Sequence, residues 1–300
     1  MLRVLTALIA LLTALPCVAA EQRVLVLGAI HDDPNSKYEQ VRPIADYIET
    51  ALADSGIESV EILIVPDRGQ MVSLLRDGRI DWVSETPFGA AYLKARTNAD
   101  FLARRWKDGA ASYRSVFFAR NDSDIESVED LRDKIIAFEH RNSTSGFFLP
   151  ASMMTERQLT LDALGTPRET PKAETFGYVY SGNEYNTAMW VHKGIAHAGV
   201  LSDSDWGRDD VIPPAFRDDM RVFETSEELP RAVELVRADL DPAIAKALRQ
   251  ALLSMHESDE AGLALATYDQ TARFDLLSDD CIDALNSVIA QLPNFVQQFP

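Results

Sequence analysis

Residues 135–150 read IIAFEHRNSTSGFFLP. The first four are apolar, which predicts a short buried strand. A polar loop follows, and the STSG run at 143–146 opens a segment that we predict to be a helix. Three hydroxyls beside the unpaired backbone N–H groups of a helix start are typical of a site for a tetrahedral oxyanion. An ordinary Ser/Thr helix cap has the same composition, so this stretch alone leaves both interpretations open.

The first twenty residues predict a cleaved export signal. An arginine gives a positive start, residues 4–15 form an apolar core too short to span a bilayer comfortably, and Val18-Ala19-Ala20 fits the small-residue cleavage pattern. A lipoprotein attached through Cys17 is the alternative, but Pro16 directly before the cysteine fits such a site poorly. We therefore expect cleavage after residue 20 and release into the periplasm as a soluble protein.

Charge and cysteine content narrow the possible functions. The chain has 47 acidic and 29 basic residues, which gives a formal charge of −18. Such a surface argues against binding nucleic acid or an anionic membrane. If the ligand is an anion, local donors must hold it against an unfavourable overall field. Without the signal, Cys281 stands alone, so no intrachain disulfide is possible and packed cores must supply the stability.

Strand-like and helix-like segments alternate along the chain. The first group has strands at 23–30, 60–65 and 80–84 and helices at 38–52, 70–76 and 88–95. This βαβαβα order predicts a largely parallel sheet covered by helices. A later group has strands at 135–138, 196–201 and 220–225 and a helix at 184–193. It predicts a second α/β unit.

We predict two α/β lobes, the second inserted into the first. Lobe 1 would comprise residues 21–118 and 225–300, and lobe 2 residues 119–224, with crossings near Ala119 and Glu224. Two crossings form a hinge, and the cleft between the lobes is the natural place for a ligand. One continuous doubly wound domain is the alternative.

With these features, the chain resembles the phosphate/phosphite/phosphonate-type periplasmic substrate-binding proteins of ABC transporters. The segments that carry the resemblance, in order, are 38–48, 78–82, 120–138, 143–150 and 226–253. The resemblance implies a two-lobed type II binding-protein fold and delivery of a small oxyanion to an ABC permease. It also implies a protein that is not an enzyme and needs no cofactor. We expect a monomer.

The resemblance indicates which side chains meet the ligand. The hydroxyl run and the helix start would hold the oxyanion, Tyr38 would close over it from lobe 1, and residues 84–87 would supply the rest of that wall. The ligand-binding residues that we predict are Tyr38, Glu85, Thr86, Ser143, Thr144, Ser145, Glu184, Tyr185 and His197.

Two positions depart from the family pattern. Glu184 stands where a histidine is usual, and His197 stands where an aspartate is usual. We predict that they form a contact with acid and base exchanged, and that His197 is a cation aimed at the anionic ligand. The alternative is that neither side chain reaches the cleft.

Other site classes fit less well. His192 and His197 are five residues apart, a spacing that does not stack two imidazoles on one helix face, so we expect no metal site. The chain has no Gly-x-Ser-x-Gly motif, and its serines lie in a cluster better suited to an anion than to nucleophilic catalysis. A periplasmic sensor that presents its ligand-bound form to a membrane kinase is the alternative function.

Overall fold

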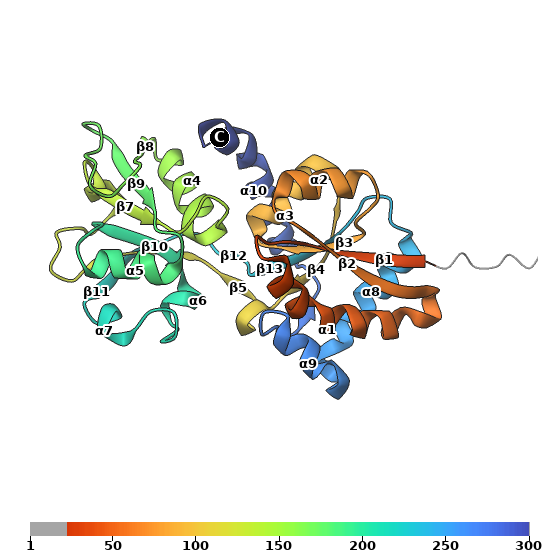
Figure 1. Cartoon of the computed structure of the whole chain (residues 1–300). Helices are drawn as coiled ribbons and strands as arrows, with labels where there is room; N and C mark the ends of the chain where they lie inside the picture. Colours follow the sequence, from red (N-terminus) through yellow and green to blue (C-terminus); the bar gives the residue numbers. More distant parts are fainter. Residues whose placement is uncertain (1–22, 300) are drawn as a thin grey trace, which may run out of the picture.

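The computed structural model describes residues 23–299, so the predicted export signal lies outside the described residues. Two lobes lie side by side and are joined by extended crossings of the chain (Figure 1). Within residues 23–299, every helix is too short or too polar to cross a lipid bilayer.

Lobe 1 is built on a six-stranded sheet with the order β14-β4-β13-β3-β1-β2. Its strands are β1 (Arg23–Ile30), β2 (Ile57–Val65), β3 (Trp82–Glu85), β4 (Asp100–Arg105), β13 (Ala232–Val236) and β14 (Phe274–Asp275). Its helices are α1 (Pro34–Leu52), α2 (Arg68–Arg76), α3 (Pro87–Thr97), α8 (Pro242–Ser254) and α9 (Gly262–Thr267). Strands β1, β2 and β3 are parallel, whereas β13 runs antiparallel to both of its neighbours.

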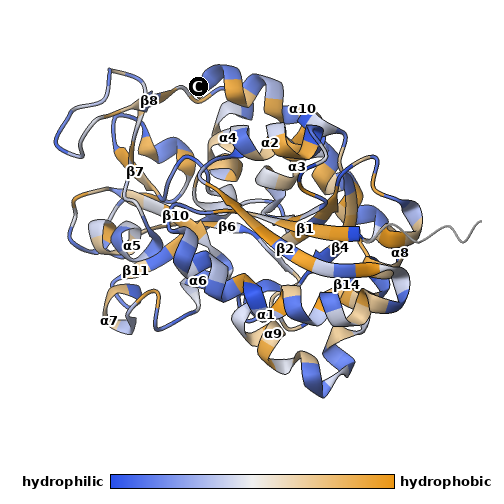
Figure 2. Cartoon of the chain, turned by 45° about the vertical axis from the view of Figure 1, so that its right-hand side comes forward, coloured by the Kyte–Doolittle hydropathy of each residue, from blue (hydrophilic) through white to orange (hydrophobic). Residues whose placement is uncertain are grey.

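Local chemistry sets where helix α1 begins. The Asp33 side chain accepts hydrogen bonds from the backbone N–H groups of Asn35 and Ser36, and Pro34 occupies the first helical position. The helix therefore starts four residues before the predicted position at Tyr38. Its apolar stripe is buried against the sheet, in which β1 is apolar along most of its length and β2 mixes apolar with polar residues (Figure 2).

Lobe 2 has a second six-stranded sheet with the order β11-β6-β10-β7-β9-β8. Its strands are β6 (Ser115–Arg120), β7 (Ile135–Phe138), β8 (Leu161–Ala163), β9 (Phe176–Tyr180), β10 (Ala198–Ser202) and β11 (Met220–Thr225). Its helices are α4 (Leu149–Glu156), α5 (Glu184–His192), α6 (Asp203–Trp206) and α7 (Pro214–Arg217). Strands β8, β9, β7 and β10 are parallel, so their carboxyl ends meet at one edge of the sheet.

The crossings pair with each other between the lobes. Strand β5 (Ser112–Tyr113) is antiparallel to β12 (Leu229–Pro230). The first crossing thus lies near residues 112–115, and the predicted boundary at 119 is too late. Ala119 is a buried residue of β6 and pairs with Ala198 inside the sheet of lobe 2. The apolar stretch at 112–120 reads as one strand in the sequence, but Arg114 separates two.

An aromatic cluster holds the lobes together beside the crossings. Helix α10 (Asp279–Gln298) packs on α3 of lobe 1, and its last turns reach lobe 2 (Figure 1). The Phe295 ring lies 5.6 Å from Phe88 of lobe 1 and 4.7 Å from Phe148 of lobe 2, measured between centroids. Phe88 and Phe148 also stack directly, at 4.6 Å. The two lobes therefore share one apolar core.

We expect Phe295→Ala to lower the free energy of unfolding by about 3–5 kcal/mol, because the truncation leaves a cavity in this shared core. Denaturant unfolding measures the change. Leu263→Ala on α9 is the control, since Leu263 is 68% exposed and its truncation should cost less than about 0.5 kcal/mol. Equal effects of the two substitutions would contradict a shared core.

Candidate functional site

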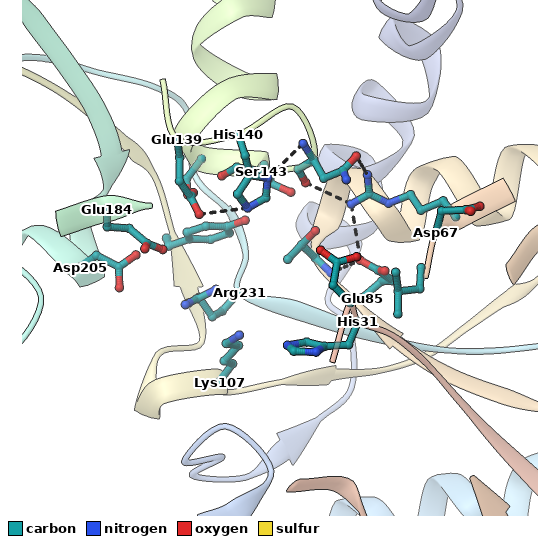
Figure 3. Close-up of a pocket in the computed structure, with 18 of the residues that line it drawn as sticks. His31, Asp67, Glu85, Lys107, Glu139, His140, Ser143, Glu184, Asp205 and Arg231 are labelled. Carbon is teal, nitrogen blue, oxygen red and sulfur yellow. Dashed lines mark hydrogen bonds and ion pairs between the residues drawn. The ribbon is translucent and has the colours of Figure 1, made fainter. Parts of the chain in front are cut away.

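A cavity of about 410 Å³ lies between the lobes at the carboxyl ends of their parallel strands. Figure 3 shows His31 and Glu85 on the lobe 1 side, Glu139, Glu184 and Asp205 on the lobe 2 side, and Lys107 and Arg231 near the crossings. In open α/β sheets, this edge of the strands is where ligands bind. The cavity is therefore the candidate ligand cleft.

The segment after β7 brings a helix start to the wall of this cavity. A π-helical turn (Thr144–Phe148) leads into α4, and Ser143, Thr144 and Ser145 line the cavity. The Ser143 hydroxyl accepts a hydrogen bond from the Gly146 N–H at 2.9 Å, so Ser143 is also a helix cap. The sequence leaves two interpretations of this segment open, a helix cap and a row of hydroxyls that faces a ligand. In the structure the segment caps the helix and also lines the cavity.

The hydroxyl groups of Ser143, Thr144 and Ser145 differ in whether they already form hydrogen bonds within the protein. Thr144 Oγ1 accepts a hydrogen bond from the Phe88 N–H of lobe 1 at 3.2 Å. The Ser145 hydroxyl makes no hydrogen bond to any residue in 23–299. Ser145 is thus the hydroxyl most available to a ligand.

A buried arginine faces the same cavity from the crossings. The Arg231 side chain is 9% exposed and lies over the Tyr113 ring, with Cζ 4.9 Å from its centroid. Its Nη2 donates to Asp108 at 2.7 Å, but its Nε has no hydrogen-bond partner among the described residues. Buried N–H groups are rarely left without an acceptor, so this donor is available for an anionic ligand.

Two carboxyl groups meet on the lobe 2 wall. Glu139 Oε1 lies 3.0 Å from His140 Nε2. Burial acts to raise the pKa of Glu139, but hydrogen bonds from His140, Ser143 and Glu184 hold it below its usual value. Burial, together with the charge of Glu139, raises the pKa of Glu184 to about 7. The hydrogen bond to Glu139 raises the pKa of His140.

One arginine joins the lobes across the cavity. From α2, Arg68 Nη1 donates to Asn142 Oδ1 at 2.9 Å and Nη2 donates to the Asn142 carbonyl at 3.1 Å. Arg68 also lies 3.8 Å from Glu85 and over the Phe88 ring. Because Asn142 belongs to lobe 2, this contact can form only when the lobes are close.

The profile of the family described as "ABC transporter, phosphonate, periplasmic substrate-binding protein" matches residues 27–281. The chain belongs to this family. It is therefore a periplasmic substrate-binding protein of the ABC-transporter type, and the predicted family is confirmed.

Solved structures agree with this assignment. XAC2383 from Xanthomonas citri bound to chloride ion is 38% identical, with 90% of this chain and 98% of that chain covered and a TM-score of 0.84. XAC2383 from Xanthomonas citri bound to ATP is 36% identical, with 92% of this chain and 99% of that chain covered and a TM-score of 0.85. PhnD1 from Prochlorococcus marinus in complex with methylphosphonate is 17% identical, with 90% of this chain and 98% of that chain covered and a TM-score of 0.65. The predicted two-lobed type II fold is confirmed.

In this substrate-binding protein, six of the nine predicted ligand-binding residues line the cavity: Glu85, Thr86, Ser143, Thr144, Ser145 and Glu184. Two predicted tyrosines do not. Tyr38 is 38% exposed, and its hydroxyl accepts a hydrogen bond from Arg42 one turn along α1. Tyr185 is 45% exposed and packs near Phe216, since one step along a helix turns a side chain by about 100° away from its neighbour.

The predicted contact between Glu184 and His197 is not made. His197 Nδ1 accepts a hydrogen bond from the N–H of Ile135, the first residue of β7, whereas Glu184 follows the last residues of β9. These are opposite ends of a four-residue parallel pairing, about 10 Å apart along the strands. Burial lowers the pKa of His197, which favours the neutral imidazole over the predicted cation.

Sequence reasoning missed Glu139, Arg68, Lys107, Asp205 and Arg231, all of which line the cavity. Glu139 could have been found, because it directly follows a parallel strand at its carboxyl end. Arg68 begins α2 and Asp205 lies in the short helix α6, whereas Lys107 and Arg231 lie beside the crossings. Only the assembled fold brings these four side chains to one cavity.

Removing the Arg68–Asn142 contact should open the ligand-free protein. We expect Arg68→Ala or Asn142→Ala to cost the closed form about 1 kcal/mol, enough to change the closed-to-open ratio about fivefold. Small-angle scattering should show a larger radius of gyration. Arg23→Ala removes an exposed ion pair with Asp241, outside the cavity lining, and is the control. An unchanged radius in both cleft variants would rule out the contact as a latch.

Proposed function

We propose that this protein captures a small phosphorus oxyanion, a phosphonate, phosphite or phosphate, and delivers it to its ABC permease. One observation carries the proposal: the helix start with Ser143, Thr144 and Ser145 and the buried Arg231 face the same cavity. Neutral donors and a buried cation together suit a compact anion with several oxygen atoms.

Electrostatics supports a site of this kind. The first turn of a helix carries partial positive charge on its free N–H groups, and hydroxyls add donors without adding charge. Arg231 is shielded from water, so its attraction for an anion is stronger than that of a surface arginine. Local donors of this strength are needed because the chain as a whole carries a charge of −18.

The ligands of related structures support an anion as well. Chloride and ATP are bound in structures of XAC2383, and methylphosphonate is bound in PhnD1. All three are anions, and two carry phosphorus-bound oxygens.

The proposed cycle follows from the two lobes. The ligand enters an open cleft, the lobes close about β5 and β12, and the closed form is what the permease recognises. The Arg68–Asn142 contact then stabilises the closed form. We further propose that the first twenty residues direct export and are removed, and that the protein works as a monomer.

Ser145→Ala should weaken binding of the true ligand without destabilising the fold. A hydrogen bond to a charged group is worth about 1.5–3 kcal/mol, so the affinity should fall roughly 10- to 150-fold. Calorimetry with methylphosphonate, phosphite, phosphate and ATP identifies the ligand and measures the change. Thermal unfolding should be nearly unchanged, because the Ser145 hydroxyl makes no hydrogen bond to the described residues.

Ser152→Ala is the matched control. Ser152 is a buried serine of α4 that does not line the cavity, so the same chemical change there should leave affinity unchanged. Equal affinities of wild type and Ser145→Ala for every one of these anions would refute the proposed site.

A further inference from the structure

The carboxyl groups of Glu139 and Glu184 line the same cavity, and each shifts the pKa of the other. Glu139 comes from the loop after β7, and Glu184 is the first residue of α5; Figure 3 shows both on the lobe 2 side. An ionised carboxylate only accepts hydrogen bonds, so two carboxylates cannot bond to each other without a proton. Two partly buried carboxylates beside each other repel when both are ionised, so their placement in one cavity favours one proton on the pair.

The pair lies against the helix start that would hold the oxyanion. A Cβ atom on Gly146 would lie 2.8 Å from Glu139 Oε2, and Glu139 also bonds the Ser143 side chain. The Glu139 side chain is 13% exposed, so water screens its charge weakly. Two ionised carboxylates here would place a double negative charge beside a bound anion.

We propose that Glu184 enters the cleft as a neutral carboxylic acid and that oxyanion binding depends on this proton. The inference rests on the proposed function and adds a specificity rule to the same site. With the proton present, the pair carries one negative charge and Glu184 is a hydrogen-bond donor. Without it, the pair repels the anion and offers no donor.

Charged and titratable groups from every neighbouring element line the same cavity as the pair. They are His140 after β7, Asp205 of α6, Tyr113 of β5, Arg231 before β13, Lys107 after β4, His31 and Asp32 after β1, Asp67 before α2, Arg68 of α2 and Glu85 of β3. Among these, Asp205 acts in the same direction as Glu139 and favours the neutral form of Glu184. His140 favours the ionised form of Glu139, which places the shared proton on Glu184.

Affinity for the oxyanion should fall as the pH rises. Because burial and Glu139 raise the pKa of Glu184 to about 7, the proton is largely present at about pH 6 and largely lost at about pH 8.5. If only the protonated form binds, the affinity of wild type should fall about 30-fold across this range.

Calorimetry with methylphosphonate across this range, on wild type and Glu184→Gln, tests the inference. The amide of glutamine keeps a neutral donor but has no proton to lose. The ionisation of methylphosphonate itself is the same in both experiments. It therefore cancels in the ratio of the wild-type affinity to the Glu184→Gln affinity. We expect that ratio to change about 30-fold between about pH 6 and about pH 8.5. A constant ratio would assign any pH dependence to His140 or to the ligand and would overturn the inference.

Asp67→Asn is the matched control. Asp67 also lines the cavity and caps α2 by accepting a hydrogen bond from the Gln70 N–H at 2.9 Å. Asparagine caps a helix equally well, so this variant loses one acidic charge of the cleft and leaves the carboxyl pair intact. It should keep the pH dependence of wild type. If Asp67→Asn instead loses the pH dependence, any carboxylate of the cleft can cause it, and this would contradict a specific role for Glu184.

A ligand-free measurement separates this inference from the proposed function. Carbon-detected NMR of the glutamate carboxyl groups should show one group that titrates near pH 7 in wild type and is missing in Glu184→Gln. A wild type with no carboxyl group titrating above about pH 6 would overturn the inference. If this titration is present but methylphosphonate binds no variant at any pH, the proposed function fails for that ligand and Glu184 is still a neutral acid.

Discussion

The helix start after β7 carries both the ligand site and the contact between the lobes. Its first three residues, Ser143 to Ser145, face the cleft, and the next aromatic pair, Phe147 and Phe148, packs into the core that the lobes share. Gly146 stands between them because any Cβ there would lie 2.6 Å from the Glu139 Cβ. A change at this turn therefore affects the ligand and the position of the lobes together.

The second constraint is electrostatic. A chain with a charge of −18 repels anions, yet its cleft gathers Arg231, Lys107 and Arg68 around neutral donors. The opposing carboxyl groups of Glu139 and Glu184 limit how much negative charge the site accepts. Discrimination between ligands then depends on charge state as well as on shape, because an extra unpaired charge in a buried site is costly.

Much of this arrangement follows from local sequence. The strand at 135–138 and the helix beginning at 184 were predictable from apolar periodicity, and the hydroxyl run after β7 indicated the cleft. The crossing at Ser112–Tyr113 was not predictable from local sequence. The end of β5 is set by its pairing with Leu229–Pro230, more than a hundred residues later in the chain. The directions in which side chains point could not be predicted from the sequence either. The family resemblance predicts His197 in the cleft, but this residue precedes β10 at the far end of the sheet.

A crystal structure with methylphosphonate bound would show directly whether the helix start after β7 holds the ligand. We expect phosphonate oxygens about 2.7–3.2 Å from the Ser145 hydroxyl, from backbone N–H groups of the helix start and from Arg231 Nε. The Glu184 carboxyl group should point toward the same oxygens. Methylphosphonate bound only against lobe 1, away from Ser143–Ser145, would refute the proposed oxyanion site.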